Sequence, residues 1–353
     1  MNAKQPSPRG RGAVSNPPNR FEKISLERDI DWDPAEDLSP QTQFLRDLSK
    51  TIITYNDSPD IPFSASINPY RGCEHGCSYC YARPTHEFLG FSAGLDFETK
   101  IMVKENAPEL LRRELASRKW KPQELAMSGV TDCYQPIERR LQLTRRCLAV
   151  LAEFRNPVSI VTKNHLVTRD LDLLRELAAH QAVMVHLSIN SLDADLARKL
   201  EPRASSPRQR LAAVEALSQA GVPVGVLVAP VIPALNDEGI PAVLAAAKAA
   251  GAGWASTEIL RLPLAVAPIF EEWLARNFPE KKDKVLGRIR AIRGGKLNDS
   301  RFGSRMRGEG IFADQISQMF HVARRKAGLA EDGPRLSTGA FRKPEGSQLA
   351  LGL

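Results

Sequence analysis

The chain has 353 residues and a formal net charge of +8, and 42% of its residues are hydrophobic, which suits a globular protein of one or two domains. It contains no run of about 18 apolar residues. Its first 20 residues, rich in Pro, Gly and Arg, lack the apolar stretch of a secretory signal. The composition therefore argues against a membrane-spanning or secreted protein, and we expect a cytoplasmic one.

The first 50 residues are predicted to lie outside the main domain. Residues 1–20 are expected to be disordered, because they cannot bury enough apolar surface to offset the chain entropy lost on ordering. Residues 21–50 mix acidic and apolar side chains and are expected to wrap over the main domain. We therefore predict a disordered or wrapping N-terminal segment over residues 1–50.

Residues 51–262 alternate between strand and helix patterns. Apolar residues three and four positions apart predict amphipathic helices along 110–115, 137–151 and 171–178, and a further helix that stops at Gly221. Six strands with intervening helices predict an α/β fold, a partial (β/α)6 barrel. Residues 263–353 predict a basic, mainly helical C-terminal extension. The β-branched runs predict strands at 64–69, 124–130, 158–162, 183–189, 222–229 and 255–261.

Three of the five cysteines lie within eight residues, with the spacing Cys73-x3-Cys77-x2-Cys80. An odd number of cysteines, clustered in this way, favours a metal site in a reducing compartment over a disulfide framework. Three neighbouring thiolates can hold three irons of a [4Fe–4S] cluster and leave the fourth iron open, as catalysis requires. Gly72 and Gly76 allow the loop to fold tightly.

A structural zinc site is the alternative interpretation of this motif, with His75 or His86 as the fourth ligand. Structural zinc sites usually draw their ligands as two separated pairs. Here His75 lies between the first two cysteines and a second pair is missing, so the cluster interpretation is favoured.

The cysteine spacing, placed after the first strand of a βα series, resembles the radical S-adenosylmethionine (radical SAM) superfamily. From about Asn56 to Pro263 the chain is similar to spore photoproduct lyase and related DNA repair photolyase-like proteins, and the similarity extends into the C-terminal region of one bacterial subgroup. The resemblance implies that the open iron is chelated by S-adenosylmethionine. It also implies that reductive cleavage of this cofactor yields a 5′-deoxyadenosyl radical, which abstracts hydrogen from the substrate.

Polar residues follow the predicted strands, where parallel barrels place their sites. The resemblance implies that Thr131 and Asp132 bind the amino group of S-adenosylmethionine and that Lys163 approaches its carboxylate. It also implies that Ser188 and Asn190 lie near the ribose. Taken singly, Asp132 could cap a helix, Lys163 could lie on the surface and Asn190 could belong to a turn. Their order behind the cysteine motif favours cofactor binding.

Four further residues complete the candidate site. The resemblance implies cofactor contacts by Tyr79 and by Glu201, and it makes Tyr81 a candidate catalytic residue. The sequence departs from the lyase at residues 128–130, where the lyase has a hydrogen-donating cysteine and this chain has none. Cys133 lies just beyond and is a second catalytic candidate. The alternative is that Cys133 is a small buried residue, as free cysteines commonly are.

Basic residues are concentrated near the C-terminus, where residues 281–343 contain 16 Lys and Arg against 6 Asp and Glu. Such an excess suits a polyanion and favours DNA or RNA as a partner, although a solvated helical surface is the alternative. The stretch 293–310 interleaves basic residues with glycine, and Phe302 and Phe312 lie in or beside it. These side chains could contact phosphates and stack on bases.

The sequence thus predicts a radical SAM enzyme, a lyase or another radical-based modifying enzyme, with a nucleic-acid substrate and a possible role in DNA lesion repair. We expect a [4Fe–4S] cluster, S-adenosylmethionine and an electron donor such as flavodoxin or ferredoxin. One alternative is radical modification of a protein, peptide or metabolite. Another is an iron–sulfur redox sensor without turnover, against which the polar strand ends argue, because a sensor needs no cofactor pocket.

Overall fold

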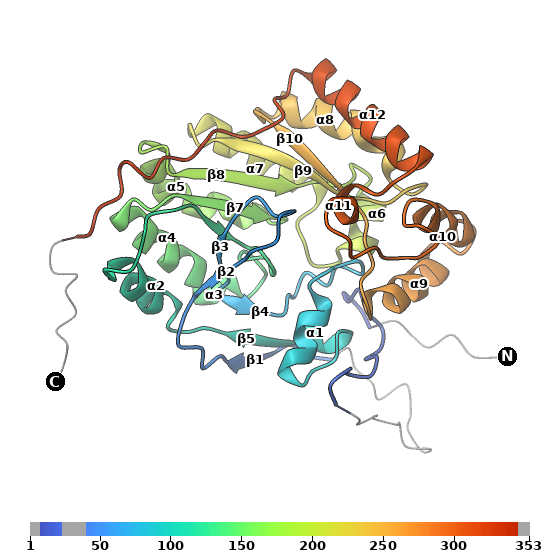
Figure 1. Cartoon of the computed structure of the whole chain (residues 1–353), viewed down its shortest axis with the longest axis horizontal. Coiled ribbons are helices and arrows are strands. Elements are labelled where there is room, and N and C mark those ends of the chain that lie inside the picture. The colour runs from blue at the N-terminus through green and yellow to red at the C-terminus, as the bar shows by residue number, and fades with distance from the viewer. Residues whose placement is uncertain (1–7, 23–39, 345–353) are drawn as a thin grey trace.

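The computed structural model describes residues 8–22 and 40–344, and its centre is a sheet with six parallel strands (Figure 1). β2 (Ile53–Tyr55) pairs antiparallel with β3 at one edge of this sheet. The predicted α/β fold with six parallel strands is confirmed, and the strand boundaries shift by at most three residues. Across the sheet the parallel strands are, in order, β3 (Ala65–Ile67), β6 (Leu125–Met127), β7 (Val158–Thr162), β8 (Val183–Ser188), β9 (Val224–Val231) and β10 (Ala255–Ile259).

Helices connect the strands and bury their apolar faces against the sheet. Leu111, Leu148, Leu174, Val214 and Leu244 of these helices share one core with the strands. The predicted helix over 137–151 is interrupted at residue 142, which has the left-handed backbone conformation. The connecting helices are α2 (Ala107–Ala116), α3 (Glu138–Leu141), α4 (Leu143–Phe154), α5 (Leu171–Ala178), α6 (Ala194–Leu200), α7 (Pro207–Gln219) and α8 (Ile240–Ala249), with 3₁₀ helices at His165–Asp170 and Asp237–Gly239.

A small second sheet, absent from the sequence-based prediction, lies beside the cysteine motif. Its strands are β1 (Gln43–Arg46), β5 (Lys100–Val103) and β4 (Tyr70–Arg71), in that order. The segment between β4 and β5 contains the cysteines, a 3₁₀ helix (Arg83–Leu89) and α1 (Leu95–Thr99). The two strands of the β4–β5 pair thus bracket the cysteine loop.

The C-terminal extension shares the core of the barrel. α9 (Val266–Asn277) and α10 (Lys282–Ala291) pack with Leu200 and Ile232 in a second apolar cluster. α12 (Ile311–Ala327) lies along α8 and adds Ile316 and Phe320 to the main core (Figure 1). The boundary predicted at residue 263 therefore does not separate two independent cores.

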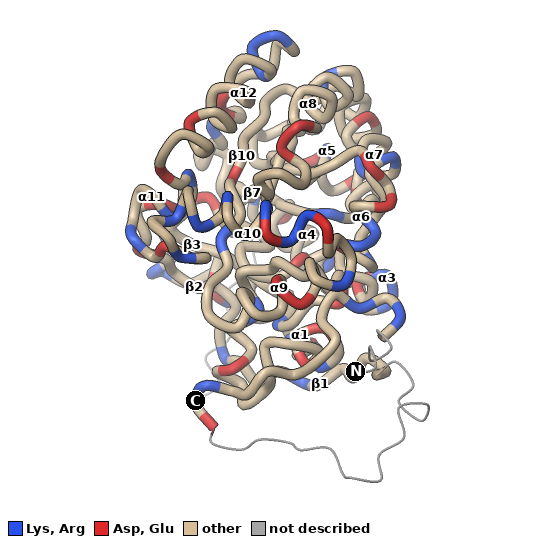
Figure 2. Tube along the Cα trace, turned by 90° about the vertical axis from the view of Figure 1, so that its right-hand side faces the viewer, with Lys and Arg blue, Asp and Glu red and all other residues tan. Residues whose placement is uncertain are grey.

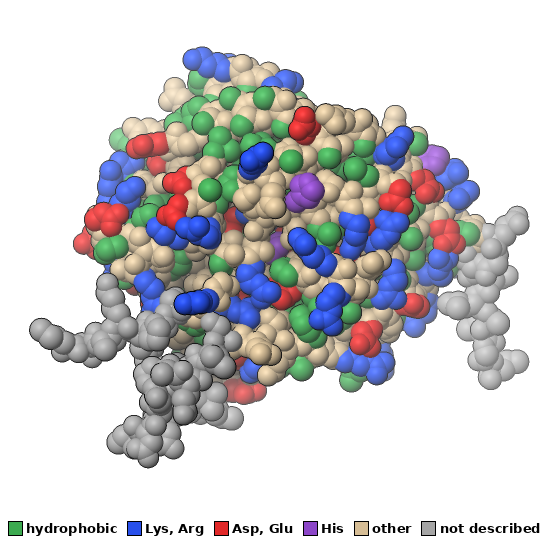
Figure 3. Space-filling view, turned by 180° about the vertical axis from the view of Figure 1, so that it is seen from behind, with side chains coloured by type: hydrophobic (Ala, Val, Ile, Leu, Met, Phe, Trp, Pro, Cys, Tyr) green, Lys and Arg blue, Asp and Glu red, His purple; other side chains and the backbone are tan. Residues whose placement is uncertain are grey.

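The short helix α11 (Ser304–Arg307) and the residues around it use their basic side chains within the protein. Arg293 donates to the carbonyl oxygens of residues 259 and 260 at 3.0 and 2.8 Å. Arg305 pairs with Asp60 at 2.6 Å, and Arg301 pairs with Asp299 at 2.9 Å. Acidic and basic residues alternate along this side of the molecule and on the rear face (Figures 2 and 3). The expected phosphate-binding stretch is therefore largely engaged in internal contacts.

Residues 8–22 wrap over the cysteine loop. The backbone N–H groups of Gly12 and Ala13 donate to the Glu98 carboxylate at 3.0 and 2.8 Å, and Arg20 pairs with Glu87 at 2.7 Å. The expectation of disorder is therefore wrong for residues 8–20, while residues 1–7 and 23–39 lie outside the described residues. Within the described ranges, no helix combines the length and apolar character needed to cross a membrane.

Candidate active site

The three motif cysteines lie together in the loop that follows β3 and β4. Cys73 and Cys77 are buried, Cys80 is half-buried, and all three are free thiols. Cys80 packs against the small apolar clusters that contain the other two. Gly72 and Gly76 adopt the left-handed conformation, with φ of 80° and 66°, as the tight loop requires. The structure therefore brings together the cysteines that the spacing singled out.

The donor set fits a cubane cluster. In the parts of the chain that the structure describes, no three His, Cys, Asp or Glu side chains converge closely enough to hold a single metal ion. Each thiolate of a cubane binds a different iron, so the three sulfur atoms need not converge on one point. Cys133 and Cys147 are fully buried in the main core, which includes none of the three motif cysteines. Three motif thiols are thus available, as a cluster with one open iron requires.

Asp132 connects the cysteine loop to the ends of two strands. Its carboxylate lies 3.3 Å from His75 Nδ1 and accepts hydrogen bonds from the Thr162 hydroxyl and the Lys163 backbone N–H, both at 2.8 Å. Burial opposes the ionised form, but the His75 charge and these hydrogen bonds lower the pKa of Asp132 to about 2. Asp132 therefore remains ionised and holds the loop in place, whatever contact it makes with a cofactor.

Glu201 forms hydrogen bonds with two other predicted site residues. Its carboxylate accepts hydrogen bonds from the Tyr79 hydroxyl and from the Asn190 amide, the latter at 3.2 Å. Tyr79, Asn190 and Glu201 come from the cysteine loop, the end of β8 and the end of α6, and all three are buried. The Asn190 Oδ1 atom is buried and has no hydrogen-bond partner among the described residues. An unsatisfied buried acceptor is costly, so it fits a ligand donor such as a ribose hydroxyl.

Arg210 completes this network and was not predicted. Its guanidinium pairs with Glu201 and also donates to the backbone oxygen of Ser188 at 2.9 Å. Arg210 lies on α7 in the same apolar stripe as Ala213, Val214 and Leu217, and all four are buried. A cation within an apolar helix face was the signal in the sequence, because a buried Arg requires a partner.

Lys163 and Tyr81 lie at the same end of the sheet. Lys163 is half-buried, and its side chain has no hydrogen-bond or ion-pair partner in the described ranges. Burial opposes its charge, but Glu201 and Cys77 raise the pKa of Lys163, so the ammonium stays charged. Tyr81 is 44% exposed, and its hydroxyl donates to the Gly129 carbonyl at 2.8 Å.

Three other candidates have internal roles. The Thr131 hydroxyl donates to the Tyr70 carbonyl at 2.8 Å, and the Ser188 hydroxyl donates to the Ala229 carbonyl at 3.1 Å. Ser188 thus fastens β8 to the neighbouring β9, and Thr131 fastens the segment after β6 to β4 of the second sheet. Cys133 has no exposed surface and packs in the main core. Its position supports the interpretation of Cys133 as a buried residue.

A buried ion pair that the sequence analysis missed supports the cysteine loop. The Arg83 guanidinium donates to the Cys77 carbonyl at 2.8 and 3.0 Å and pairs with Glu98 at 2.5 Å. Both side chains are fully buried. Because Glu98 also binds the backbone of residues 12 and 13, one carboxylate joins the N-terminal segment to the cysteine loop.

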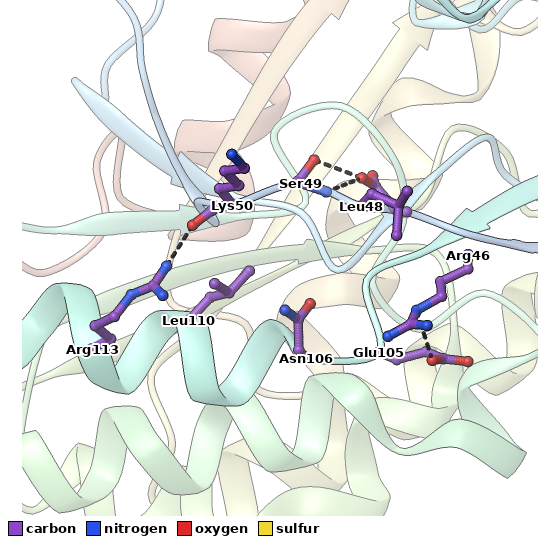
Figure 4. Close-up of a pocket in the computed structure, with 9 residues that line it drawn as sticks. Arg46, Leu48, Ser49, Lys50, Glu105, Asn106, Leu110 and Arg113 are labelled. Atoms are coloured by element: carbon purple, nitrogen blue, oxygen red, sulfur yellow. Dashed lines mark hydrogen bonds and ion pairs between the residues drawn. The ribbon is translucent and has the colours of Figure 1, made fainter. Parts of the chain in front are cut away.

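Two cavities lie away from the cysteines. One, of about 280 Å³, separates residues 46–50 from α2, and Arg46 and Glu105 pair across it at 3.6 Å (Figure 4). The other, of about 400 Å³, lies between the N-terminal segment, α6 and α9, and its walls include Arg11, Lys199 and Trp273. None of the predicted site residues lines either cavity, so these cavities do not define the candidate active site.

The chain is similar in sequence to uncharacterized proteins and similar in fold to solved structures. An uncharacterized protein of Mycobacterium tuberculosis is 40% identical over 222 residues, which are 62% of this chain and 65% of that protein. An uncharacterized protein of Methanocaldococcus jannaschii is 34% identical over 171 residues, 48% of this chain and 61% of that protein. The aligned part of the chain thus spans less than two thirds of each relative.

The fold is also similar to that of spore photoproduct lyase complexed with dinucleoside spore photoproduct. The TM-score is 0.56 at 19% identity, over 80% of this chain and 78% of that one. The family model of the radical SAM superfamily matches residues 67–247, more than half of the chain, including all three motif cysteines. The chain therefore belongs to the radical SAM superfamily of enzymes.

Proposed function

We propose that this chain binds a [4Fe–4S] cluster through Cys73, Cys77 and Cys80 and binds S-adenosylmethionine beside it. When bound, the cluster supplies the electron that cleaves S-adenosylmethionine, and the resulting carbon radical abstracts hydrogen from the substrate. The observation that carries the proposal is the group of three free thiols next to the Glu201 network, at the carboxyl ends of the strands. Free thiols of this kind suit a reducing compartment such as the cytoplasm.

The surrounding residues would bind and orient S-adenosylmethionine. The Lys163 ammonium, charged and unpaired, would attract the carboxylate of the cofactor. The Asn190 Oδ1 atom would accept a hydrogen bond from a ribose hydroxyl. Glu201 would hold Asn190 and Tyr79 in position through its two hydrogen bonds. Asp132, next to Thr131, would receive the amino group in exchange for one of the four contacts that its carboxylate makes within the chain.

A nucleic-acid substrate is favoured within this proposal. Spore photoproduct lyase, which shares the fold, binds a dinucleoside lesion. Tyr81 is exposed at the carboxyl ends of the strands, where a substrate would meet the radical. The electron would come from a small redox protein such as flavodoxin or ferredoxin.

Deuterium transfer distinguishes this substrate from the alternatives. The reduced protein is incubated without oxygen with S-adenosylmethionine and either deuterated oligonucleotides or deuterated protein extract. We expect deuterium in 5′-deoxyadenosine only with the oligonucleotides. Transfer from the protein extract alone would instead establish protein or peptide modification. Cofactor binding without cleavage under any condition would favour a redox sensor.

The cluster assignment predicts a specific pattern among cysteine variants. Cys73→Ala, Cys77→Ala and Cys80→Ala should each lose the visible absorbance and most of the iron of the reconstituted protein, because each thiolate holds one iron. Cys133→Ala and Cys147→Ala are matched controls in the core and should keep both. Full iron content in all three motif variants would contradict the assignment.

A further inference from the structure

Two charged side chains near Tyr81, Glu258 and Arg261, have hydrogen-bonding capacity that the described residues do not use. Glu258 lies on β10 and Arg261 two residues beyond its end, and both are half-buried. Neither side chain forms a hydrogen bond or an ion pair in the described ranges 8–22 and 40–344. A half-buried carboxylate and guanidinium with unused acceptors and donors can therefore bind a ligand.

The two residues face the cysteine loop from the far edge of the barrel. The Arg261 guanidinium stacks on the Tyr81 ring, 4.7 Å from its centroid. Burial raises the pKa of Glu258 and the charge of Arg261 opposes this shift, so the two side chains lie near each other. Tyr81 follows β3 and Glu258 belongs to β10, at opposite edges of the six parallel strands. The cysteine loop therefore reaches the end of β10 at the opposite edge of the sheet.

Glu258 lies where the pairing between β10 and β9 is irregular. The pairing of β10 with β9 changes register between Thr257 and Ile259, so Glu258 sits at an irregularity. Irregular pairs of this kind re-aim side chains and are frequent beside active sites. Arg293 fixes the next turn of chain by donating to the carbonyls of residues 259 and 260. Glu258 and Arg261 are thus held on a supported backbone.

An aromatic surface adjoins this pair. Phe63 is half-buried and lies against Gly129, whose carbonyl accepts the Tyr81 hydroxyl bond. Val130, the next residue, is 38% exposed. Tyr81 thus contacts the Arg261 guanidinium through its ring. Its hydroxyl contacts Gly129, which lies beside Phe63.

We infer that Glu258 and Arg261 bind the polar edge of a nucleobase, with Glu258 accepting from a ring N–H and Arg261 donating to the neighbouring carbonyl. This inference rests on the proposed nucleic-acid substrate and specifies how that substrate is recognised. Carboxylate and guanidinium groups read base edges in this way, and enzymes that act on a base stack it on aromatic or apolar side chains. A phosphate would be repelled by Glu258, so the mixed pair favours a base over the backbone.

The inference is tested with a short oligothymidylate and its N3-methylated counterpart, which lacks the ring N–H. Binding is measured by calorimetry without oxygen, on protein containing cluster and S-adenosylmethionine. We expect the wild type to prefer the unmethylated probe by about tenfold, as loss of one charge-assisted hydrogen bond implies. Glu258→Ala should abolish this preference, Glu258→Gln should restore part of it, and Arg261→Ala should weaken binding of both probes.

The controls separate this inference from the proposed function. Glu280→Ala removes an exposed carboxylate beyond α9 and should change nothing. Cluster absorbance and affinity for S-adenosylmethionine should stay unchanged in every variant. Wild-type binding that is indifferent to N3-methylation, or unaltered in Glu258→Ala and Arg261→Ala, would overturn the inference and leave the nucleic-acid substrate standing. Failure of the wild type to bind either probe would overturn both, while the cluster and cofactor assignments would remain.

Discussion

At the scale of single residues, Lys163 is the clearest point of contact for a cofactor. Its ammonium is held in the charged form by Glu201 and Cys77, yet it forms no bond of its own within the described part of the chain. Asp132 differs, because its carboxylate already binds Thr162, the Lys163 backbone and His75. Substitution of Asp132 would loosen the cysteine loop, so Lys163 is the better probe of the cofactor site.

Lys163→Gln should weaken S-adenosylmethionine binding by about tenfold to a hundredfold. The physical reason is the loss of a charge-assisted hydrogen bond, worth roughly 1.5–3 kcal/mol. The measurement is equilibrium dialysis of labelled cofactor against cluster-loaded protein. Lys248→Gln, at an exposed position on α8, is the control and should bind normally. Unchanged affinity in Lys163→Gln with an intact cluster would place the cofactor carboxylate elsewhere.

The site residues that could be predicted from the sequence are those with a characteristic spacing. Cysteine spacing identifies a metal site directly, because few other structures require three thiols in eight residues. Arg83, Glu98 and Arg210 have no such pattern. Each is a common charged residue whose role depends on burial and on a partner, and Glu98 also binds the distant Gly12. A single sequence records the residues but not their pairing.

At the scale of elements, the N-terminal segment is the largest departure from expectation. Residues 8–22 contain little apolar surface, so composition predicted disorder, yet backbone hydrogen bonds to Glu98 and Asn16 contacts with Asp96 hold the segment in place. Gly12 makes this docking possible. A Cβ atom at Gly12 would lie 1.7 Å from the carbonyl oxygen of Gly76 in the cysteine loop.

Gly12→Ala should displace the segment from the cysteine loop. The backbone of Gly76 and Ser78 leaves no room for a methyl group, so the segment must shift. We expect faster trypsin cleavage after Arg11, whose side chain is held by the carbonyls of Glu98 and Pro40 in the wild type. Gly239→Ala, where nothing lies within 4 Å of the added Cβ atom, is the matched control. Equal cleavage rates in all three proteins would show that the docking does not protect the segment.

The elements that were predicted are the ones with long apolar periodicity. Most residues of the six parallel strands are buried, β7, β8 and β9 are rich in β-branched residues, and the helices between the strands present regular apolar faces. The unpredicted strands β1, β2, β4 and β5 have at most four residues each. β3 and β6 are just as short, but they fall within the regular alternation of strands and helices. The break between α3 and α4 depends on a left-handed Gln142, which is not a residue type that usually marks such a turn.

At the scale of the whole molecule, the C-terminal extension closes the barrel. α11 meets the loop before β3, where Arg305 pairs with Asp60 and the Gly303 N–H donates to the same carboxylate at 2.8 Å. Residues 328–344 then run back across the amino ends of the strands (Figure 1). Ala330 bridges to Trp254, and the Ser337 N–H donates to the Gln181 carbonyl at 2.9 Å. The excess of basic residues predicted a nucleic-acid-binding surface here, but several of these basic side chains form ion pairs within the protein.

The end of this returning segment should contribute measurably to stability. The Phe341 ring packs against Phe154 with centroids 6.2 Å apart, and the Arg342 N–H donates to the Phe154 carbonyl at 2.9 Å. Phe341→Ala removes a half-buried ring, so we expect the free energy of unfolding to fall by about 1–3 kcal/mol, below the range for a fully buried Phe. Urea denaturation of the cluster-free protein measures the change.

The control for this prediction lies on the same segment. Arg335 is exposed and has no hydrogen-bond or ion-pair partner among the described residues, so Arg335→Ala should shift the free energy of unfolding by less than about 0.5 kcal/mol. If Phe341→Ala were as stable as Arg335→Ala, the segment would rest on the barrel without stabilising it. A clear difference would instead make residues 328–344 part of the folded core, because only a segment docked in solution can transmit the loss of one ring to the whole domain.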